Sequence, residues 1–425
     1  MANQQHLALI EQGTTVWNEW YSKNKRVIPD LAKANLSGLN LTGINLKKAN
    51  LSNANLSHTN LTKAQLVNAN LQGANFLGAN LEDANLRGAN LDYVILTQAK
   101  LNPKTIIALK IRHVYDLVNG LVEDKNFNGI DLKNTNLFGV DLSHADLSNA
   151  QLENANLSRA NLSHAYLFKA DLSNANLQNA NLRNAYFSQA NLSYVYFNGA
   201  LCCGAYFKNA ELNFANLYRA KFSRKTMIDL KWFSVWKIVN RGAVRKNLSG
   251  IDLSNANLQG VDLSEANLTN ANLSHSILRH SKLDRANLTN TDLAGANVKG
   301  VNLEQANLKG AKLKSLVGRK QKKRSPVATK SAPVDSGNVM VKEKPTTIRV
   351  ASQTSPPTQE LSIARGQDKS KKRPNVLGLL LLAILASVVA GCYTFVSRDP
   401  NFYWQKFLQE VQPWKSKIEQ LIPLN

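Results

Sequence analysis

The sequence predicts an all-β solenoid with short capping and inserted α-helices, followed by one C-terminal transmembrane helix. Leucine recurs at every fifth residue over residues 31–101, 127–222 and 248–313, where 41 of the 49 central positions hold Leu. Two breaks in this period instead place apolar residues three and four apart, which is typical of an α-helix. Residues 376–396 form a run of 21 uncharged, mostly apolar residues, which is long enough to cross a bilayer.

The five-residue period predicts a coil that turns after every pentapeptide. In an extended chain, residues two apart point to the same side, so the Ala that lies two before each central Leu can face inward with it. Neither a continuous strand nor a helix repeats such a pair every five residues. Asn or Asp precedes most of the central leucines, and these side chains favour turns because they bond to nearby backbone groups. Stacked coils would bury the inward pairs in one continuous column.

One five-residue motif recurs through the chain with few changes. Near-perfect copies of Ala-Asn-Leu-x-x are centred on Leu51, Leu56, Leu71, Leu81, Leu157, Leu177 and Leu258. The motif resembles that of the pentapeptide-repeat family, and the long arrays with tandem helices look like its bacterial, and especially cyanobacterial, members. The resemblance implies a right-handed quadrilateral β-helix with four pentapeptides in each coil. Residues twenty apart would then stack, so that Phe187 and Phe207 join these leucines in the structural core as ring neighbours.

An amphipathic helix over residues 6–22 is expected to cap the first coil. Ile10, Val16, Trp17 and Trp20 recur at helical spacing. An uncapped coil would leave leucines and unpaired backbone groups in water, and solenoids cover such ends with terminal elements.

The two breaks predict helices over residues 104–121 and 225–242. Each break runs 26 residues from the last central position to the next, and the two breaks align without gaps. Because 26 is one more than five pentapeptides, the register slips by one residue at each break. We therefore divide this part of the chain into three modules of helix and array, residues 1–101, 102–222 and 223–313.

Three further segments follow the arrays. Residues 314–375 carry 15 Lys and Arg against 4 acids and no apolar period, which predicts a disordered basic linker. The transmembrane helix is expected at 376–396 and an amphipathic tail at 397–425. Small residues four apart, Ser387 and Gly391, would permit weak homo-oligomerisation of the span.

Basic residues immediately before the span predict its orientation. The four that lie closest are Lys369, Lys371, Lys372 and Arg373. Positive charge is retained on the cytoplasmic side of a membrane, so we expect the arrays to face the cytoplasm. We also expect these four side chains to contact anionic lipid.

The sequence contains no set of residues that predicts catalysis, a cofactor or a metal site. It has no glycine loop for phosphate and no His-x-x-x-His or Cys-x-x-Cys spacing. Four histidines occupy outward positions of the pentapeptides: His58, His144, His164 and His275. Cys202 takes a central position and Cys203 should face outward, and three cysteines without framework spacing fit a reducing compartment.

The expected function is that of a non-enzymatic, membrane-tethered scaffold whose polar faces bind a protein partner. An accessory subunit of a transport or envelope-assembly system remains an alternative. Some members of the family that this chain resembles protect DNA gyrase with an acidic rod that imitates DNA. Here the outward positions include Lys47, Lys63 and Arg159 alongside acids, which disfavours such a topoisomerase-binding mimic. Nearly half of the net charge of +23 lies in the linker, which has no aromatic residues, so specific nucleic-acid binding is not expected.

These features generate a prediction about topology. Protease added to inverted membrane vesicles should cut the linker and release the arrays, whereas on right-side-out vesicles it should trim only the tail. If the linker is a flexible coil, its root-mean-square reach is about 40 to 50 Å, so it is accessible beside the membrane. Immunoblotting against the N-terminus reads the result, and release of the arrays from right-side-out vesicles would contradict the orientation.

Overall fold

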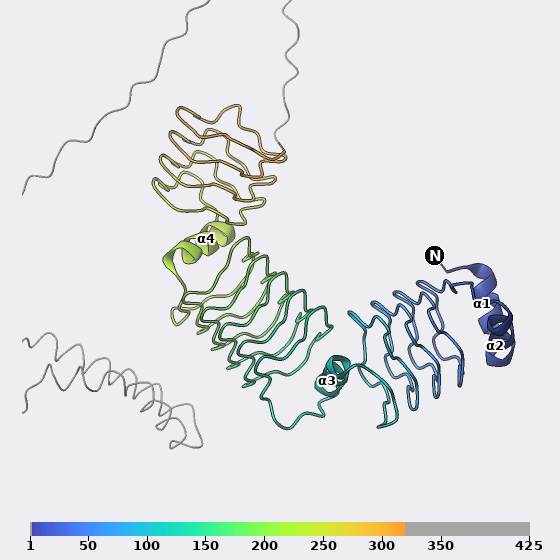
Figure 1. Ribbon diagram of the computed structural model, residues 1–425. Helices are drawn as coiled ribbons and strands as arrows, with labels where there is room; N and C mark the ends of the chain where they lie inside the picture. Colours follow the sequence, from blue (N-terminus) through green and yellow to red (C-terminus); the bar gives the residue numbers. More distant parts are fainter. Residues whose placement is uncertain (1, 319–425) are drawn as a thin grey trace, which may run out of the picture. The chain divides into compact units, whose positions relative to one another are not determined.

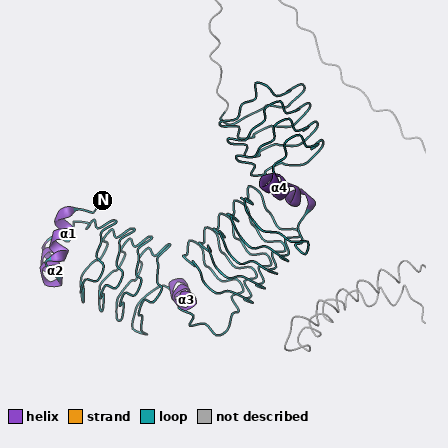
Figure 2. Ribbon diagram, turned by 180° about the vertical axis from the view of Figure 1, so that it is seen from behind, coloured by secondary structure: helices purple, strands orange, loops and turns teal. Residues whose placement is uncertain are grey.

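Stacked coils of twenty residues form three arrays in a computed structural model, which describes residues 2–318 (Figure 1). Parallel bridges join residues twenty apart, such as Asn35 with Asn55 and Asn156 with Asn176. Twenty residues hold four pentapeptides, so each coil has four sides and the fold is a quadrilateral β-helix. Each side contributes a single bridge, and Figure 2 accordingly shows the coils as loops rather than as strands.

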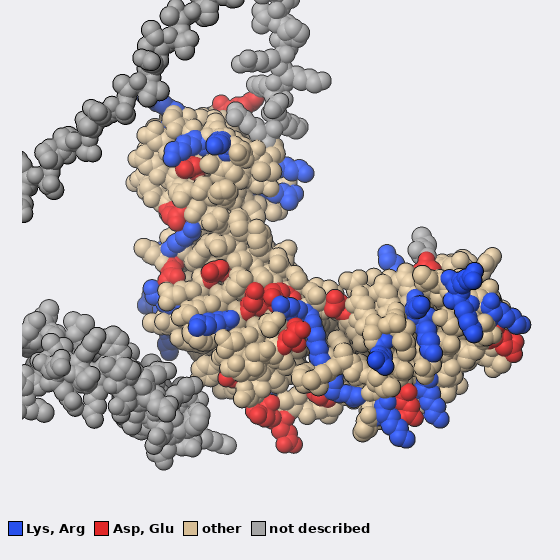
Figure 3. Space-filling model, viewed as in Figure 1, with Lys and Arg blue, Asp and Glu red and all other residues tan. Residues whose placement is uncertain are grey.

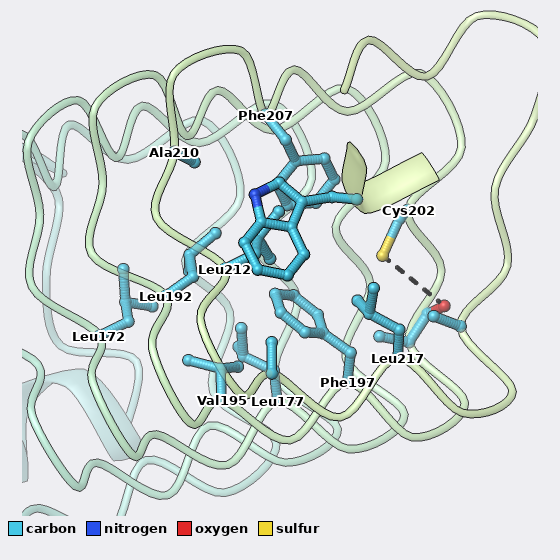
Figure 4. Packing of buried hydrophobic residues seen from close by; sticks show 14 of the residues in the cluster. Leu172, Leu177, Leu192, Val195, Phe197, Cys202, Phe207, Ala210, Leu212 and Leu217 are labelled. Atoms are coloured by element: carbon cyan, nitrogen blue, oxygen red, sulfur yellow. Dashed lines mark hydrogen bonds between the residues drawn. The ribbon is translucent and has the colours of Figure 1, made fainter. Parts of the chain in front are cut away.

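The core of each array is a column built from the inward pairs. The expected core residues Leu51, Leu56, Leu71, Leu157, Leu177, Phe187, Phe207 and Leu258 are all buried. The rings of Phe187 and Phe207 stack with centroids 4.9 Å apart and planes 4° from parallel, and the Phe197 ring meets Phe207 edge-on at 6.0 Å. Figure 4 shows Phe197, Leu177 and Leu212 converging beneath Phe207 in the interior.

A polar turn follows each central residue. In most pentapeptides the second residue after the centre has a positive φ, which is why Asn and Gly are frequent at this position. The residue before the centre supports the turn from the other side: Asn156 Oδ1 accepts hydrogen bonds from Ser158 N at 3.3 Å and Ser158 Oγ at 2.6 Å. Asn156 Nδ2 also donates to Asn136 Oδ1 one coil earlier, at 3.0 Å. The same Asn side chain therefore stabilises both its own turn and the stacking of one coil on the next.

The N-terminal cap consists of two helices rather than the one predicted over residues 6–22. They are α1 (Gln4–Glu11) and α2 (Thr14–Lys23), and they separate at Gly13, whose φ of 105° is not helical. The prediction of one helix was wrong because the apolar spacing continues across this glycine.

Helix α2 covers the first coil and satisfies its backbone. Trp17 is fully buried, and its Nε1 donates to Asn45 O at 2.7 Å. Asn18 Nδ2 donates to Gly43 O at 3.1 Å, and Tyr21 Oη donates to Lys47 O at 2.9 Å. These bonds replace the ones that a preceding coil would have made.

The breaks contain helices α3 (Leu109–Val118) and α4 (Leu230–Arg241), both shorter than the predicted ranges 104–121 and 225–242. The residues before each helix continue the last coil instead. Ile106 bridges Asn85, and Met227 bridges Tyr206, so these bridges join residues 21 rather than 20 apart. The extra residue of each break therefore lies in a six-residue side just before the helix.

The two breaks build the same joint twice. We call residues 103–125 the first joint and 224–246 the second joint; a shift of 121 positions relates them. Lys110 Nζ pairs with Asp131 at 3.5 Å, and at the shifted positions Lys231 Nζ pairs with Asp252 at 3.1 Å. The ion pair joins each helix to the array that follows it, and buried apolar residues such as Val114 and Val235 pack the helix into the core.

An asparagine near the end of each helix bonds to the preceding array. Asn119 Nδ2 donates to Leu96 O at 3.1 Å, and its Oδ1 accepts from Gln98 N at 2.6 Å. Asn240 repeats this with Leu217 O at 2.9 Å and with the backbone N of Arg219 at 2.6 Å. The asparagine thus supplies the backbone partners that a further coil would have supplied.

Backbone bonds also pass directly from one array to the next beside each helix. Tyr93 N donates to Asn134 O at 2.8 Å, and Phe214 N donates to Asn255 O at 2.7 Å, again 121 positions further on. The joints therefore include direct contact between successive arrays.

No helix within residues 2–318 is long and apolar enough to cross a membrane. The predicted span at 376–396 and the tail lie outside the described residues, as does the linker from residue 319 onward. The predicted linker start at 314 was wrong, because the last coil continues to Val317, which bridges Asn297.

An introduced carboxylate should destabilise the protein strongly at an inward position and only slightly at an outward position. Leu157→Asp places a carboxylate in the column and should destabilise the second array by at least about 3 to 5 kcal/mol. Ser158→Asp, one residue further along, is half-buried at the surface and loses only the hydrogen bond from Ser158 Oγ to Asn156, so it should cost less than about 1.5 kcal/mol. Urea denaturation followed by circular dichroism measures both variants. Equal damage would contradict this assignment of inward and outward positions.

Candidate functional site

Histidine side chains, which are common catalytic groups, stack on one another between adjacent coils. His144 and His164 stack with centroids 4.8 Å apart and planes 3° from parallel, and Asn184 Nδ2 lies 3.3 Å from His164 Nε2. His58 and His275 are exposed at equivalent corner positions. Among residues 2–318, no group of His, Cys, Asp or Glu side chains could hold a metal ion. The arrangement provides no paired nucleophile and base.

Carboxylates before the central residues are engaged in turns. Hydrogen bonds from Ser264 Oγ and Ser264 N lower the pKa of the Asp262 carboxyl, and Lys282 Nζ lies 3.6 Å from it. The hydrogen bond from Ala294 N lowers the pKa of Asp292 in the same way. The pKa of each carboxyl is lowered because the ionised form accepts hydrogen bonds from the turn. These carboxylates therefore have a structural role.

Cys202 is a core residue, and Cys203 lies nearer the surface. Burial raises the pKa of the Cys202 thiol, with a smaller contribution from Cys203, so the thiol stays protonated. Its Sγ lies 3.9 Å from Ala200 O inside the column (Figure 4). A buried protonated thiol is a poor nucleophile.

Outward aromatic residues gather on the second array. On one of its sides, the residue before the centre is Tyr in three successive coils: Tyr166, Tyr186 and Tyr206. We call these three residues the tyrosine ladder. The rings of Tyr186 and Tyr206 stack with centroids 4.7 Å apart, and those of Tyr166 and Tyr186 are 6.5 Å apart. The bridge from Tyr206 to Met227 extends the row to an exposed methionine.

The ladder departs from the commonest choice at this position in three successive coils, whereas departures such as Ile95, Leu201 and Ile277 are single apolar residues. Asn or Asp normally occupies it and accepts a hydrogen bond from the backbone N–H two residues on, as Asn156 does. A tyrosine ring cannot supply that acceptor, so three successive turns lack it. Such a departure from local turn chemistry, with rings left at the surface, marks a functional position more readily than a structural one.

The first and third arrays do not share this aromatic surface. Residues 247–313 contain no Phe, Tyr or Trp, and residues 30–101 contain only Phe76 and Tyr93. The second array adds exposed Tyr196 and Tyr218 on a different side from the ladder. The aromatic surface is therefore specific to one array of otherwise equivalent coils.

Sequence reasoning did not find the ladder, although the signal was present. The three tyrosines lie twenty residues apart, so only a reading by whole coils, not by pentapeptides, aligns them. The predicted lipid-contact residues Lys369, Lys371, Lys372 and Arg373 lie outside the described residues.

The fold and its surface define a β-helical repeat protein with twenty-residue coils and no constellation for chemistry among its described residues. The model of the family described as pentapeptide repeats matches residues 30–66, 64–102, 126–150, 145–184, 185–224, 247–285 and 281–315. These ranges span more than half of the chain, and the protein belongs to the pentapeptide-repeat family.

Solved structures that are similar to parts of this chain include two from cyanobacteria. HetL from Nostoc sp. strain PCC 7120, a pentapeptide repeat protein involved in regulating heterocyst differentiation, is 24% identical over 69% of this chain and 93% of its own, with a TM-score of 0.16. Rfr23 from Cyanothece 51142 is 29% identical over 37% and 89%, with a TM-score of 0.17. QnrB1, a plasmid-mediated fluoroquinolone resistance protein, is 23% identical over 45% and 80%, with a TM-score of 0.20. No curated protein matches the sequence.

The two adjacent cysteines yield a prediction that tests the inward and outward faces chemically. In the folded protein, a soluble maleimide should modify Cys203 at least about ten times faster than Cys202, because Cys202 is buried and protonated. Site-resolved peptide mass spectrometry measures both rates, and unfolding in urea should make them similar. Equal rates in the folded protein would contradict the burial of Cys202.

Proposed function

We propose that this protein is a non-enzymatic, membrane-tethered interaction scaffold, and that the tyrosine ladder binds its protein partner. The ladder is the observation that carries the proposal: three successive coils carry Tyr where most coils carry Asn or Asp, with Tyr166 39% exposed and Tyr186 and Tyr206 half-buried. Tyrosine is enriched in protein interfaces because its ring buries a large area while its hydroxyl still forms a hydrogen bond.

A protein surface fits the ladder better than a small ligand does. The rings of Tyr186 and Tyr206 cover one another face to face, so their edges and hydroxyls are what the partner meets. The stacked coils hold this row in place through backbone hydrogen bonds such as Tyr206 N to Ala185 O at 2.9 Å. A rigid row of ring edges loses little conformational freedom on binding, which favours association.

Membrane tethering rests on the sequence after the arrays. The uncharged run at 376–396 and the basic residues before it support one membrane crossing with the arrays in the cytoplasm. An accessory subunit of a transport or envelope-assembly system would use the same surface and the same tether. The identity of the bound protein distinguishes these two roles.

The charge distribution argues against imitation of DNA. The third array, residues 247–313, carries six basic and six acidic residues. Figure 3 shows Lys and Arg interspersed with Asp and Glu over the arrays on the face in view. A DNA mimic requires a row of negative charge, which this mixed surface does not provide.

The proposal predicts that three substitutions abolish partner binding without unfolding the array. In the ladder variant Tyr166→Asn/Tyr186→Asn/Tyr206→Asn, each ring is replaced by the residue found at the same position in other coils. Removal of a central aromatic cluster should weaken partner recovery by at least about tenfold. Quantitative affinity purification of the full chain from detergent-solubilised membranes measures this.

The matched control is Tyr196→Asn/Tyr218→Asn, which removes two exposed tyrosines from another side of the same array. The control should retain every partner that the ladder variant loses. Unchanged recovery of the same proteins by the ladder variant would refute the ladder as the binding surface.

A further inference from the structure

Both joints connect successive arrays through an equivalent ion pair and equivalent asparagine bonds, but they differ in net charge. The first joint, residues 103–125, contains four Lys and Arg and three acids, a net charge of +1. The second joint, residues 224–246, contains seven Lys and Arg and one acid, a net charge of +6. Because both joints form the equivalent ion pair and asparagine bonds, the additional positive charge is not needed to join two arrays.

Part of the charge at the second joint is already paired. Lys231 pairs with Asp252, and Arg245 pairs with Glu265 at 2.8 Å. Within the described residues, Arg224, Lys237 and Arg241 form no ion pair, and all three are exposed. The first joint has Pro103, Asp116 and Gly120 at the matching positions, so these three cations are particular to the second joint.

Apolar side chains accompany these cations. Leu230, at the start of α4, is 80% exposed, and Met227 beside it is 56% exposed. The matching Leu109 and Ile106 of the first joint are 70% and 51% exposed, so the apolar pair is common to both joints and the added charge is not. Phe233 replaces Arg112 of the first joint and stacks on Trp236 at 5.6 Å. Leu230, Phe233 and Arg224 also line one shallow hollow between α4 and the second array. The surface therefore combines exposed apolar groups with an excess of positive charge.

We propose that the second joint is a contact site for an anionic phospholipid bilayer, with Arg224, Lys237 and Arg241 binding headgroup phosphates and with Leu230 and Met227 entering the interface. Short helices that present apolar side chains flanked by Lys and Arg lie at such interfaces, and anionic lipid attracts each basic residue. The site is distinct from the basic residues before the predicted span and does not depend on the partner proposed for the tyrosine ladder.

The arrangement of the rings favours lipid over nucleic acid. Base stacking requires open ring faces. Here the Lys237 ammonium lies 4.5 Å from the centroid of the Phe233 ring, and the Arg241 guanidinium lies 5.5 Å from that of Trp236. The Trp236 ring also stacks on Phe222 at 5.0 Å. With these faces occupied, the open groups of the site are cations and aliphatic chains, as a bilayer interface requires.

Hydrogen exchange on the full chain tests the site, with the first joint as an internal control. The protein is reconstituted in nanodiscs of phosphatidylcholine alone or of phosphatidylcholine and phosphatidylglycerol in equal amounts. Peptides of α4 and its flanks should exchange at least about tenfold more slowly in the anionic discs, and high salt should reverse this. The matching peptides of the first joint should exchange equally in both discs.

The charge variant Arg224→Gln/Lys237→Asp/Arg241→Gln should lose this protection, while peptides from the column keep their slow exchange. Lys237→Asp introduces the residue that the first joint carries naturally. Equal exchange of wild-type α4 in the two discs, or equal slowing at both joints, would overturn the proposal whether or not the variant folds. Retained protection in a folded variant would also overturn it. Protection by a DNA duplex in neutral discs, without protection by phosphatidylglycerol, would assign the site to nucleic acid instead.

Discussion

Backbone hydrogen bonding between residues twenty apart is the constraint on which the rest of this structure depends. On one side of the second array, Leu157 N donates to Asn176 O at 2.8 Å, and Asn176 N donates to Ala155 O at 2.9 Å. Each side thus exchanges bonds with the coil above it, and the register holds Ala over Ala and Leu over Leu. A single pentapeptide buries nothing, so the stability of the column comes from stacking neighbours. The same constraint does not fix the three outward residues of a pentapeptide, where the turn favours Asn or Asp before the centre and Asn or Gly two residues after it.

The constraint also determines how the column starts and how it is interrupted. An open coil exposes unpaired donors and acceptors, and any element that replaces a coil must bond to them. From Ile107 to Phe127, and again from Ile228 to Leu248, the chain is twenty residues long, so each inserted helix uses the length of one coil. The backbone donors and acceptors along the side of a helix are already paired within the helix. The side-chain amides of Asn119 and Asn240 therefore bond to the backbone of the preceding array instead. Trp17, Asn18 and Tyr21 meet the same requirement at the N-terminal end.

The strength of this constraint explains which features could be predicted from the sequence. The inward positions follow from the fivefold period, and the stacking of Phe187 on Phe207 follows from four pentapeptides in a coil. Helix boundaries were less predictable because Ile107 satisfies both patterns: it fits the helical spacing but follows a bridging residue of the last coil. The split at Gly13 depends on a single backbone conformation that apolar spacing does not encode. The same alignment of four pentapeptides in a coil places Tyr166, Tyr186 and Tyr206 in one row, so the geometry of the tyrosine ladder was also predictable.

Variation at the outward positions carries information because the column does not require it. Two joints with the equivalent ion pair and asparagine bonds provide a comparison within one chain: both expose an apolar pair, and they differ in the cations around it. The added cations belong to the second joint, and the bridge from Tyr206 to Met227 places the tyrosine ladder directly beside it. A protein bound to the ladder would therefore lie within about one coil spacing, about 5 Å along the column, of the proposed lipid contact. The aromatic surface and the basic surface adjoin at one end of the second array, so a bilayer at the joint would hold the ladder and its partner close to the membrane surface.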